Sequence, residues 1–156
     1  DKSFTSGHIG FWTKSDAVTY FGDTTVVYRP KEILAQTLVK DAFQKYPRLQ
    51  GLKIYAPASE NGGLRVVASL DSSEVGQAAP EEVGKVLLER GYYYGKRNGE
   101  VMLTLPLHDS NGDKVAAVRV VMKSFLGQTE NNALARAMPV VKGMETRIVT
   151  LKDLTQ

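Results

Sequence analysis

The feature that most constrains the fold is a pair of apolar runs separated by a short polar turn. Residues 101–107 and 114–124 are rich in Val, Leu and Met, and the turn Asp109–Asp113 between them contains Asn-Gly. Turn residues of this kind between two apolar runs predict an antiparallel β-hairpin. Alternate side chains of each strand should then lie on opposite faces of a sheet.

Helix and strand signals alternate through the preceding part of the chain. Apolar residues at helical spacing predict a helix over 33–46, which Pro47 ends. The next two predicted strands, 52–56 and 64–70, are joined by a Gly-rich turn and form a second antiparallel hairpin.

Two further helices complete the pattern. The segment 78–91 opens with a proline and two glutamates and ends on a glycine, which predicts a short helix. A longer helix follows Thr129, with an apolar face through Ile148 and a kink predicted at Pro139. This order predicts an α+β domain: an antiparallel sheet with a long N-terminal and a long C-terminal helix on one face and a short helix between the strand pairs.

The length of 156 residues predicts one domain. We assign that domain to residues 31–156. Residues 1–30 are predicted to be a lead-in, with a hairpin over 17–28 that turns at Gly22-Asp23.

Composition excludes several classes of function. The chain has no cysteine and two histidines, His8 and His108, and none of the motifs for a nucleophile elbow, a phosphate loop or a zinc protease. We therefore expect no cofactor, no metal and no enzymatic activity, unless His108 bonds a carboxylate in a cleft. The 20 basic and 17 acidic residues are scattered, and no apolar run approaches the ~20 residues of a membrane span, so we expect neither nucleic-acid binding nor a membrane segment in this chain.

Polar side chains gather on the sheet face away from the predicted end helices, which we call the second face. Strand alternation places Tyr55, Thr104, His108 and Arg119 there, among small apolar residues. Such a mixture is typical of a ligand pocket, but an ordinary solvated face of an antiparallel sheet would give the same pattern.

Arg119 is the most informative of these residues, because it interrupts a run of Val and Ala. A buried guanidinium without a partner is costly, so Arg119 must reach water, pair with a carboxylate or bind an anionic ligand. The tyrosine run 92–94 could cover such a ligand, or could pack between the short helix and the sheet.

The sequence from about Lys31 to Ile148 resembles the Cache family of PAS-like sensor domains. Val75-Gly76 stands where that family has an Ile-Gly pair before its short helix, and Ala116-Ala117 departs from a second Ile-Gly. The residues that match the family's closing hairpin are Leu105, Pro106, Leu107, Asp109, Asn111 and Gly112.

The resemblance implies a bacterial periplasmic or extracellular sensor domain for signal transduction, which binds a small organic molecule such as a carboxylate or an amino acid. Its ligand contacts, carried over by position, fall on Tyr55, Tyr93, Tyr94, Thr104 and Arg119. The alternative is a structural or protein-interaction domain of an exported protein, with no small-molecule ligand. In that case the second face would dock a partner or a second copy in a homodimer.

Overall fold

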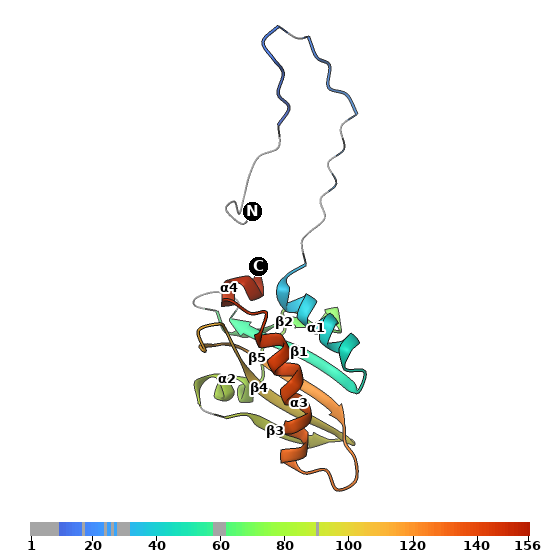
Figure 1. Ribbon diagram of the computed structural model, residues 1–156, viewed down its shortest axis with the longest axis vertical. Coiled ribbons are helices and arrows are strands. Elements are labelled where there is room, and N and C mark those ends of the chain that lie inside the picture. Colours follow the sequence, from blue (N-terminus) through green and yellow to red (C-terminus); the bar gives the residue numbers. More distant parts are fainter. Residues whose placement is uncertain are drawn as a thin grey trace. The chain divides into compact units, whose positions relative to one another are not determined.

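The computed structural model describes residues 10–16, 18–23, 25, 27, 32–57, 62–89 and 91–156. The chain divides into two units, residues 1–30 and residues 31–156 (Figure 1). No helix in the described residues is long and apolar enough to cross a membrane.

The smaller unit has no helix or strand among its described residues. The rings of Phe11 and Phe21 pack with their centroids 4.5 Å apart, while Trp12 and Tyr20 are exposed. Of the hairpin predicted over 17–28, the described residues 18–23, 25 and 27 contain no strand, and the other positions lie outside the described residues. An isolated two-stranded ribbon is at best marginally stable in water, because it buries little apolar surface.

The larger unit alternates helices and strands. In chain order, its described residues form α1 (Leu34–Lys45), β1 (Leu49–Pro57), β2 (Leu64–Ser69), the 3-10 helix η1 (Ser72–Glu74), α2 (Glu81–Leu88), β3 (Tyr93–Arg97), β4 (Glu100–His108), β5 (Lys114–Lys123), α3 (Glu130–Glu145) and α4 (Leu151–Thr155).

The strands form one antiparallel sheet in the order β2-β1-β5-β4-β3. The α+β class with an antiparallel sheet is therefore confirmed. The prediction omitted β3, which pairs with β4 across the tight turn at Asn98-Gly99, and it also omitted η1 and α4. The α3 helix runs past Pro139 to Glu145 without a break in its assignment.

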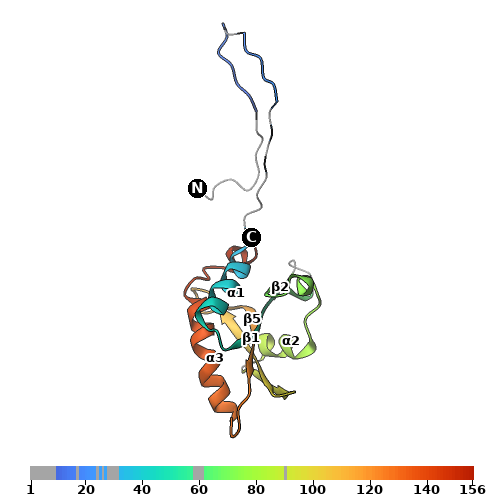
Figure 2. The same ribbon diagram turned by 90° about the vertical axis from the view of Figure 1, so that its right-hand side faces the viewer.

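The main hydrophobic core lies between the sheet and the helices α1 and α3. Figure 2 shows these two helices on one side of the sheet and α2 on the other. The predicted inward sets of β4 and β5 are confirmed, since all of their members are buried in this core: Val101, Leu103, Leu105, Leu107, Ala116, Val118, Val120 and Met122.

A smaller apolar cluster lies on the second face, beneath α2. It joins Tyr55 of β1, Val66 of β2 and Ala117 of β5 to Val83 of α2. This cluster covers only part of the second face. The polar residues next to the cluster are therefore partly sheltered by α2, and the rest of the face is not covered by it.

His108 does not lie on the second face, which corrects the prediction from strand alternation. The register between β4 and β5 shifts between Leu107 and His108, and a bulge of this kind redirects the side chains that follow it. His108 instead faces α3, where its backbone N–H and its Nδ1 lie 3.1 and 2.6 Å from Oε1 of Glu145.

Candidate functional site

A row of polar residues crosses the second face of the sheet. Strand register aligns Ser69 of β2 with Lys53 of β1, Lys53 with Arg119 of β5, Arg119 with Thr104 of β4, and Thr104 with Tyr93 of β3. Residues that are directly opposite in adjacent strands project from the same face. All five strands therefore contribute one side chain to this row.

Arg119 is at the centre of the row and is largely enclosed, with 11% of its side chain exposed. Its Nε donates to Oγ1 of Thr104 at 3.0 Å, and its Nη2 donates to Oε1 of Glu82 at 2.8 Å. Its Cζ lies 5.6 Å from the centroid of the Tyr55 ring, within the range of a cation–π contact. The structure thus gives Arg119 a carboxylate partner and does not expose it to open solvent.

Tyr55 and Thr104 are both buried beneath this arginine. Burial raises the pKa of the Tyr55 phenol, although the positive charge of Arg119 lowers it in part. Tyr55 therefore places a neutral phenol ring beside the guanidinium, and the Thr104 hydroxyl oxygen accepts a hydrogen bond that orients Arg119.

A second ion pair lies next to Arg119 in the row. Nζ of Lys53 donates to Oε1 of Glu74 at 2.6 Å, and Oγ of Ser69 donates to Oε2 of the same carboxylate at 2.6 Å. Partial burial would raise the pKa of Glu74, but the hydrogen bonds from Lys53 and Ser69 outweigh burial and lower it. Each cation of the row is thus matched by one carboxylate, from η1 or from α2.

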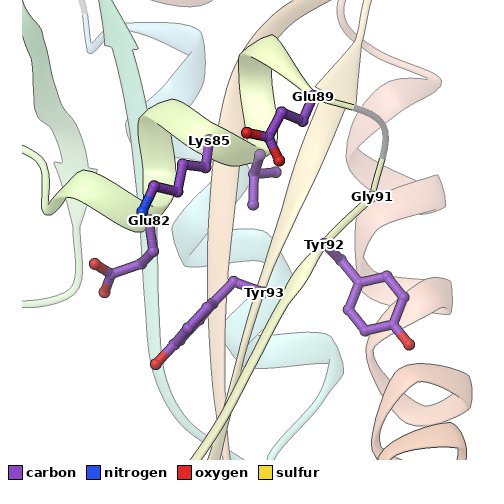
Figure 3. A pocket seen from close by; sticks show the side chains of 7 residues that line it. Glu82, Lys85, Glu89, Gly91, Tyr92 and Tyr93 are labelled. Atoms are coloured by element: carbon purple, nitrogen blue, oxygen red, sulfur yellow. The ribbon is translucent and has the colours of Figure 1, made fainter.

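A groove of about 210 Å³ opens beside Glu82, between α2 and β3. We call it the α2 groove, and Figure 3 shows its residues. It is lined by Glu82, Lys85, Val86, Glu89, Gly91, Tyr92 and Tyr93.

The two tyrosines of the α2 groove point in different directions. The Tyr93 ring lies toward Glu82, whereas the Tyr92 ring points away from α2 (Figure 3), and its hydroxyl donates to Glu130 of α3 at 2.7 Å. Tyr93 also covers Gly95, where an added Cβ would meet the ring at 3.2 Å. The absence of a side chain at Gly95 therefore leaves room for the Tyr93 ring.

The α2 helix is fixed to the sheet at both ends. Near its start Glu82 pairs with Arg119, and Val83 packs in the smaller cluster. At its C-terminal end, Nζ of Lys114 donates to the carbonyls of Val86 at 3.2 Å and of Glu89. A lysine at this position satisfies carbonyls that have no partner within the helix and opposes the negative end of the helix dipole.

The predicted site residues divide into two groups. Tyr55, Thr104 and Arg119 are in contact, and Tyr93 follows them in register and lines the α2 groove. Tyr94 is not brought together with them, because it packs against the main core on the opposite face.

His108 bonds a carboxylate, but neither His108 nor Glu145 lines the α2 groove. The pair links the end of β4 to α3 and resembles a structural tie more than a catalytic pair in a cleft. Among the described residues, no group of three or more His, Asp or Glu side chains could hold a metal ion.

Glu82 and Lys53 are the functional candidates that sequence reasoning missed. The pattern identified Glu81 and Glu82 only as acidic residues suited to a helix N-terminus. The placement of Glu82 over Arg119 depends on the packing of α2 on the second face, for which the sequence holds no local signal.

Solved structures with a similar fold include a GAF domain and transcriptional regulators. The second GAF domain of DevS from Mycobacterium smegmatis aligns with a TM-score of 0.53 at 15% identity, covering 71% of this chain and 88% of that chain. The repressor BlcR from Agrobacterium tumefaciens aligns with a TM-score of 0.51 at 13% identity, covering 78% of this chain and 67% of that one. A transcriptional regulator of the IclR family from Rhodococcus aligns with a TM-score of 0.52 at 18% identity, covering 82% of this chain and 66% of that chain.

No protein-family model matches the sequence, and no curated protein sequence matches it. The likeness is therefore one of fold. The larger unit has an α+β fold with a five-stranded antiparallel sheet that resembles the fold of a GAF domain.

Proposed function

We propose that residues 31–156 form a small-molecule-binding sensor domain whose ligand site is the α2 groove together with the polar row beneath it. The observation that carries this proposal is Arg119, a largely enclosed cation with an aromatic ring, a hydroxyl and one partly exposed carboxylate around it. The similarity in fold to a GAF domain and to transcriptional regulators supports a sensory role.

The ligand in this proposal is a small carboxylate or an amino acid. A guanidinium carries five N–H donors, and within the described residues Arg119 uses two of them, toward Thr104 and Glu82. A ligand carboxylate can replace Glu82, which is 32% exposed and also lines the α2 groove. Exchange of one carboxylate for another would remove the ion pair that ties the first turn of α2 to β5 and so change the surface that a partner contacts.

We further propose membership of the Cache family and a periplasmic or extracellular location in a bacterium. The support is the match of Val75-Gly76 and of the β4–β5 hairpin to the pattern of that family. In this proposal the domain is a receptor module for signal transduction and not an enzyme.

A protein-interaction role is the second candidate, and the smaller unit favours it. Trp12 is 84% exposed and Tyr20 is 92% exposed, and isolated aromatic side chains of this kind are common anchors of protein interfaces. In this alternative the domain docks a partner or a second copy and binds no small molecule.

A thermal-shift screen of the twenty amino acids and of short mono- and dicarboxylates tests the proposed function. At least one compound should raise the unfolding midpoint of the wild type, and Arg119→Gln should weaken its binding by about tenfold or more. Glu82→Gln should strengthen binding, because it removes the competing carboxylate. Glu81→Gln, one residue earlier in α2 and 82% exposed, is the matched control and should leave binding unchanged.

Failure of every compound to raise the midpoint would refute the proposal, as would an equal response from Arg119→Gln. If Arg119→Gln does not fold, Arg119→Lys keeps the charge and removes the planar fork, and it should still weaken binding. Weaker binding by Glu82→Gln would instead mean that a ligand ammonium contacts Glu82, which contradicts the exchange of carboxylates.

A further inference from the structure

A second groove, of about 340 Å³, lies on the other side of the molecule, where the C-terminal end of α1 meets β1, β5 and α3. We call it the basic groove. It is lined by Lys45, Tyr46, Pro47, Arg48, Leu49, Met122, Arg136 and Val140. These elements are neighbours in Figure 1. Its volume falls in the range of about 300–1,000 Å³ that is usual for small-molecule sites.

The floor of the basic groove is apolar and belongs to the main core. Leu49 and Met122 are directly paired in the β1–β5 register, and both are buried with Val140 of α3 in the main core. Tyr46 forms a wall, since its hydroxyl donates to the carbonyl of Pro139 at 3.3 Å and so connects the end of α1 to α3. A flat or aliphatic ligand body could pack against this floor and wall.

The rim of the basic groove is cationic. Lys45, Arg48 and Arg136 line it, and no acidic residue does. Within the described part of the chain, none of these three side chains has a carboxylate within 4.0 Å. This contrasts with the second face, where Lys53 and Arg119 each have a carboxylate partner.

Arg136 is also held in place before any ligand binds. Its Nη1 donates to the carbonyl of Lys123 at 3.3 Å, and its Cζ lies 5.5 Å from the centroid of the Phe125 ring. Lys45 lies over the Tyr46 ring at 5.5 Å. Cations fixed by such contacts lose less side-chain entropy on binding an anion.

We propose that the basic groove binds a small organic anion with an apolar body, such as an aromatic or medium-chain carboxylate. Cations that have no carboxylate partner among the described residues, arranged around an apolar floor, match both parts of such a molecule. The site is separate from the α2 groove, because the two grooves share no lining residue. A polyanion such as a nucleic acid would need a longer cationic stripe than three side chains around a hollow.

Calorimetric titration with benzoate, phenylacetate and hexanoate at low salt tests this inference, with benzamide and hexanamide as neutral counterparts. At least one anion should bind saturably, and its amide should bind about tenfold more weakly or not at all. Arg48→Gln should weaken anion binding about tenfold. This variant should fold normally, because the Arg48 side chain is exposed. Lys152→Gln, an exposed cation of α4, should bind as the wild type does.

Several results would overturn the inference. One is the absence of saturable binding by all three anions, and another is equal binding by the amides or by Arg48→Gln. Loss of binding in Arg119→Gln with full binding in Arg48→Gln would place the anion on the second face. Concentration-dependent dimerisation that Arg48→Glu abolishes would show that a second copy occupies the groove.

Discussion

At the scale of single residues, the candidate site is centred on the pair formed by Arg119 and Glu82. Their hydrogen bond of 2.8 Å joins a side chain that is 11% exposed to one that is 32% exposed. Removing one partner of a largely buried pair leaves the other charge without compensation. The cost to folding should therefore be measurable even though Glu82 is partly solvated.

We expect Glu82→Gln to lower the free energy of unfolding by about 1–2 kcal/mol, below the value for a fully buried pair because solvent screens Glu82. Urea denaturation of the unliganded wild type and variant measures this difference in the free energy of unfolding. Glu81→Gln is again the control, because Glu81 forms only an exposed pair with Lys85 four residues later and should change stability much less. Equal changes in the free energy of unfolding for the two substitutions would show that the Arg119–Glu82 bond stabilises the fold no more than an exposed ion pair does.

Acid stability should depend on Glu145 in a definite direction. Burial raises the pKa of Glu145, but hydrogen bonds from Lys142 and His108 outweigh burial and hold it below the ordinary value of 4.5. A carboxylate with a lowered pKa in the folded protein contributes stability above its unfolded pKa, and this is lost as the pH falls through the folded pKa. Between about pH 5 and pH 3, the wild type should thus lose unfolding free energy more steeply than Glu145→Gln. Parallel pH profiles of the two proteins would contradict this.

The face on which a side chain lies was predicted correctly where it depends only on the alternation of side chains along a strand. Tyr55, Thr104 and Arg119 meet because each occupies the predicted face of a correctly predicted strand. Tyr93 and Tyr94 were assigned to the same site, but adjacent residues of a strand face opposite sides, and β3 was not predicted as a strand. His108 follows a register shift that alternation cannot anticipate.

At the scale of elements, α2 is the part of the structure that builds the candidate site. The sequence predicted its existence from a proline, two glutamates and a final glycine, but could not predict that it lies on the second face. The strand β3 was missed because it is five residues long and contains Gly95, so its hydrophobic pattern is weak.

Lys114 provides a test of how α2 is held. Lys114→Met removes the ammonium that donates to the last carbonyls of α2, so amide hydrogen exchange over residues 86–89 should accelerate by about tenfold, equivalent to the loss of one charge-assisted bond. Exchange in β1 and β4 should be unchanged. Lys123→Met, an exposed cation at the other end of β5, is the matched control. Unaltered exchange at the end of α2 would mean that apolar packing alone fixes the helix.

At the scale of the whole larger unit, the sheet separates two faces with different chemistry. One face packs against α1 and α3 and has the basic groove at its margin, and the other holds the paired charges beneath α2. The class of fold followed from the sequence because hairpins and helices are local. The strand order could not be predicted from the sequence. The paired residues of β1 and β5 are more than sixty residues apart in the chain, and no local pattern specifies their pairing.

Amide NMR titration of the whole chain with the twenty amino acids and with short mono- and dicarboxylates tests most directly whether the second face binds a ligand. We predict that at least one compound shifts the resonances of α2, of Tyr93 and of the amides around Thr104 and Arg119, saturably and without comparable shifts in α1. The absence of saturable shifts from every compound, or shifts confined to residues outside the second face, would contradict the assignment of this face as the ligand site.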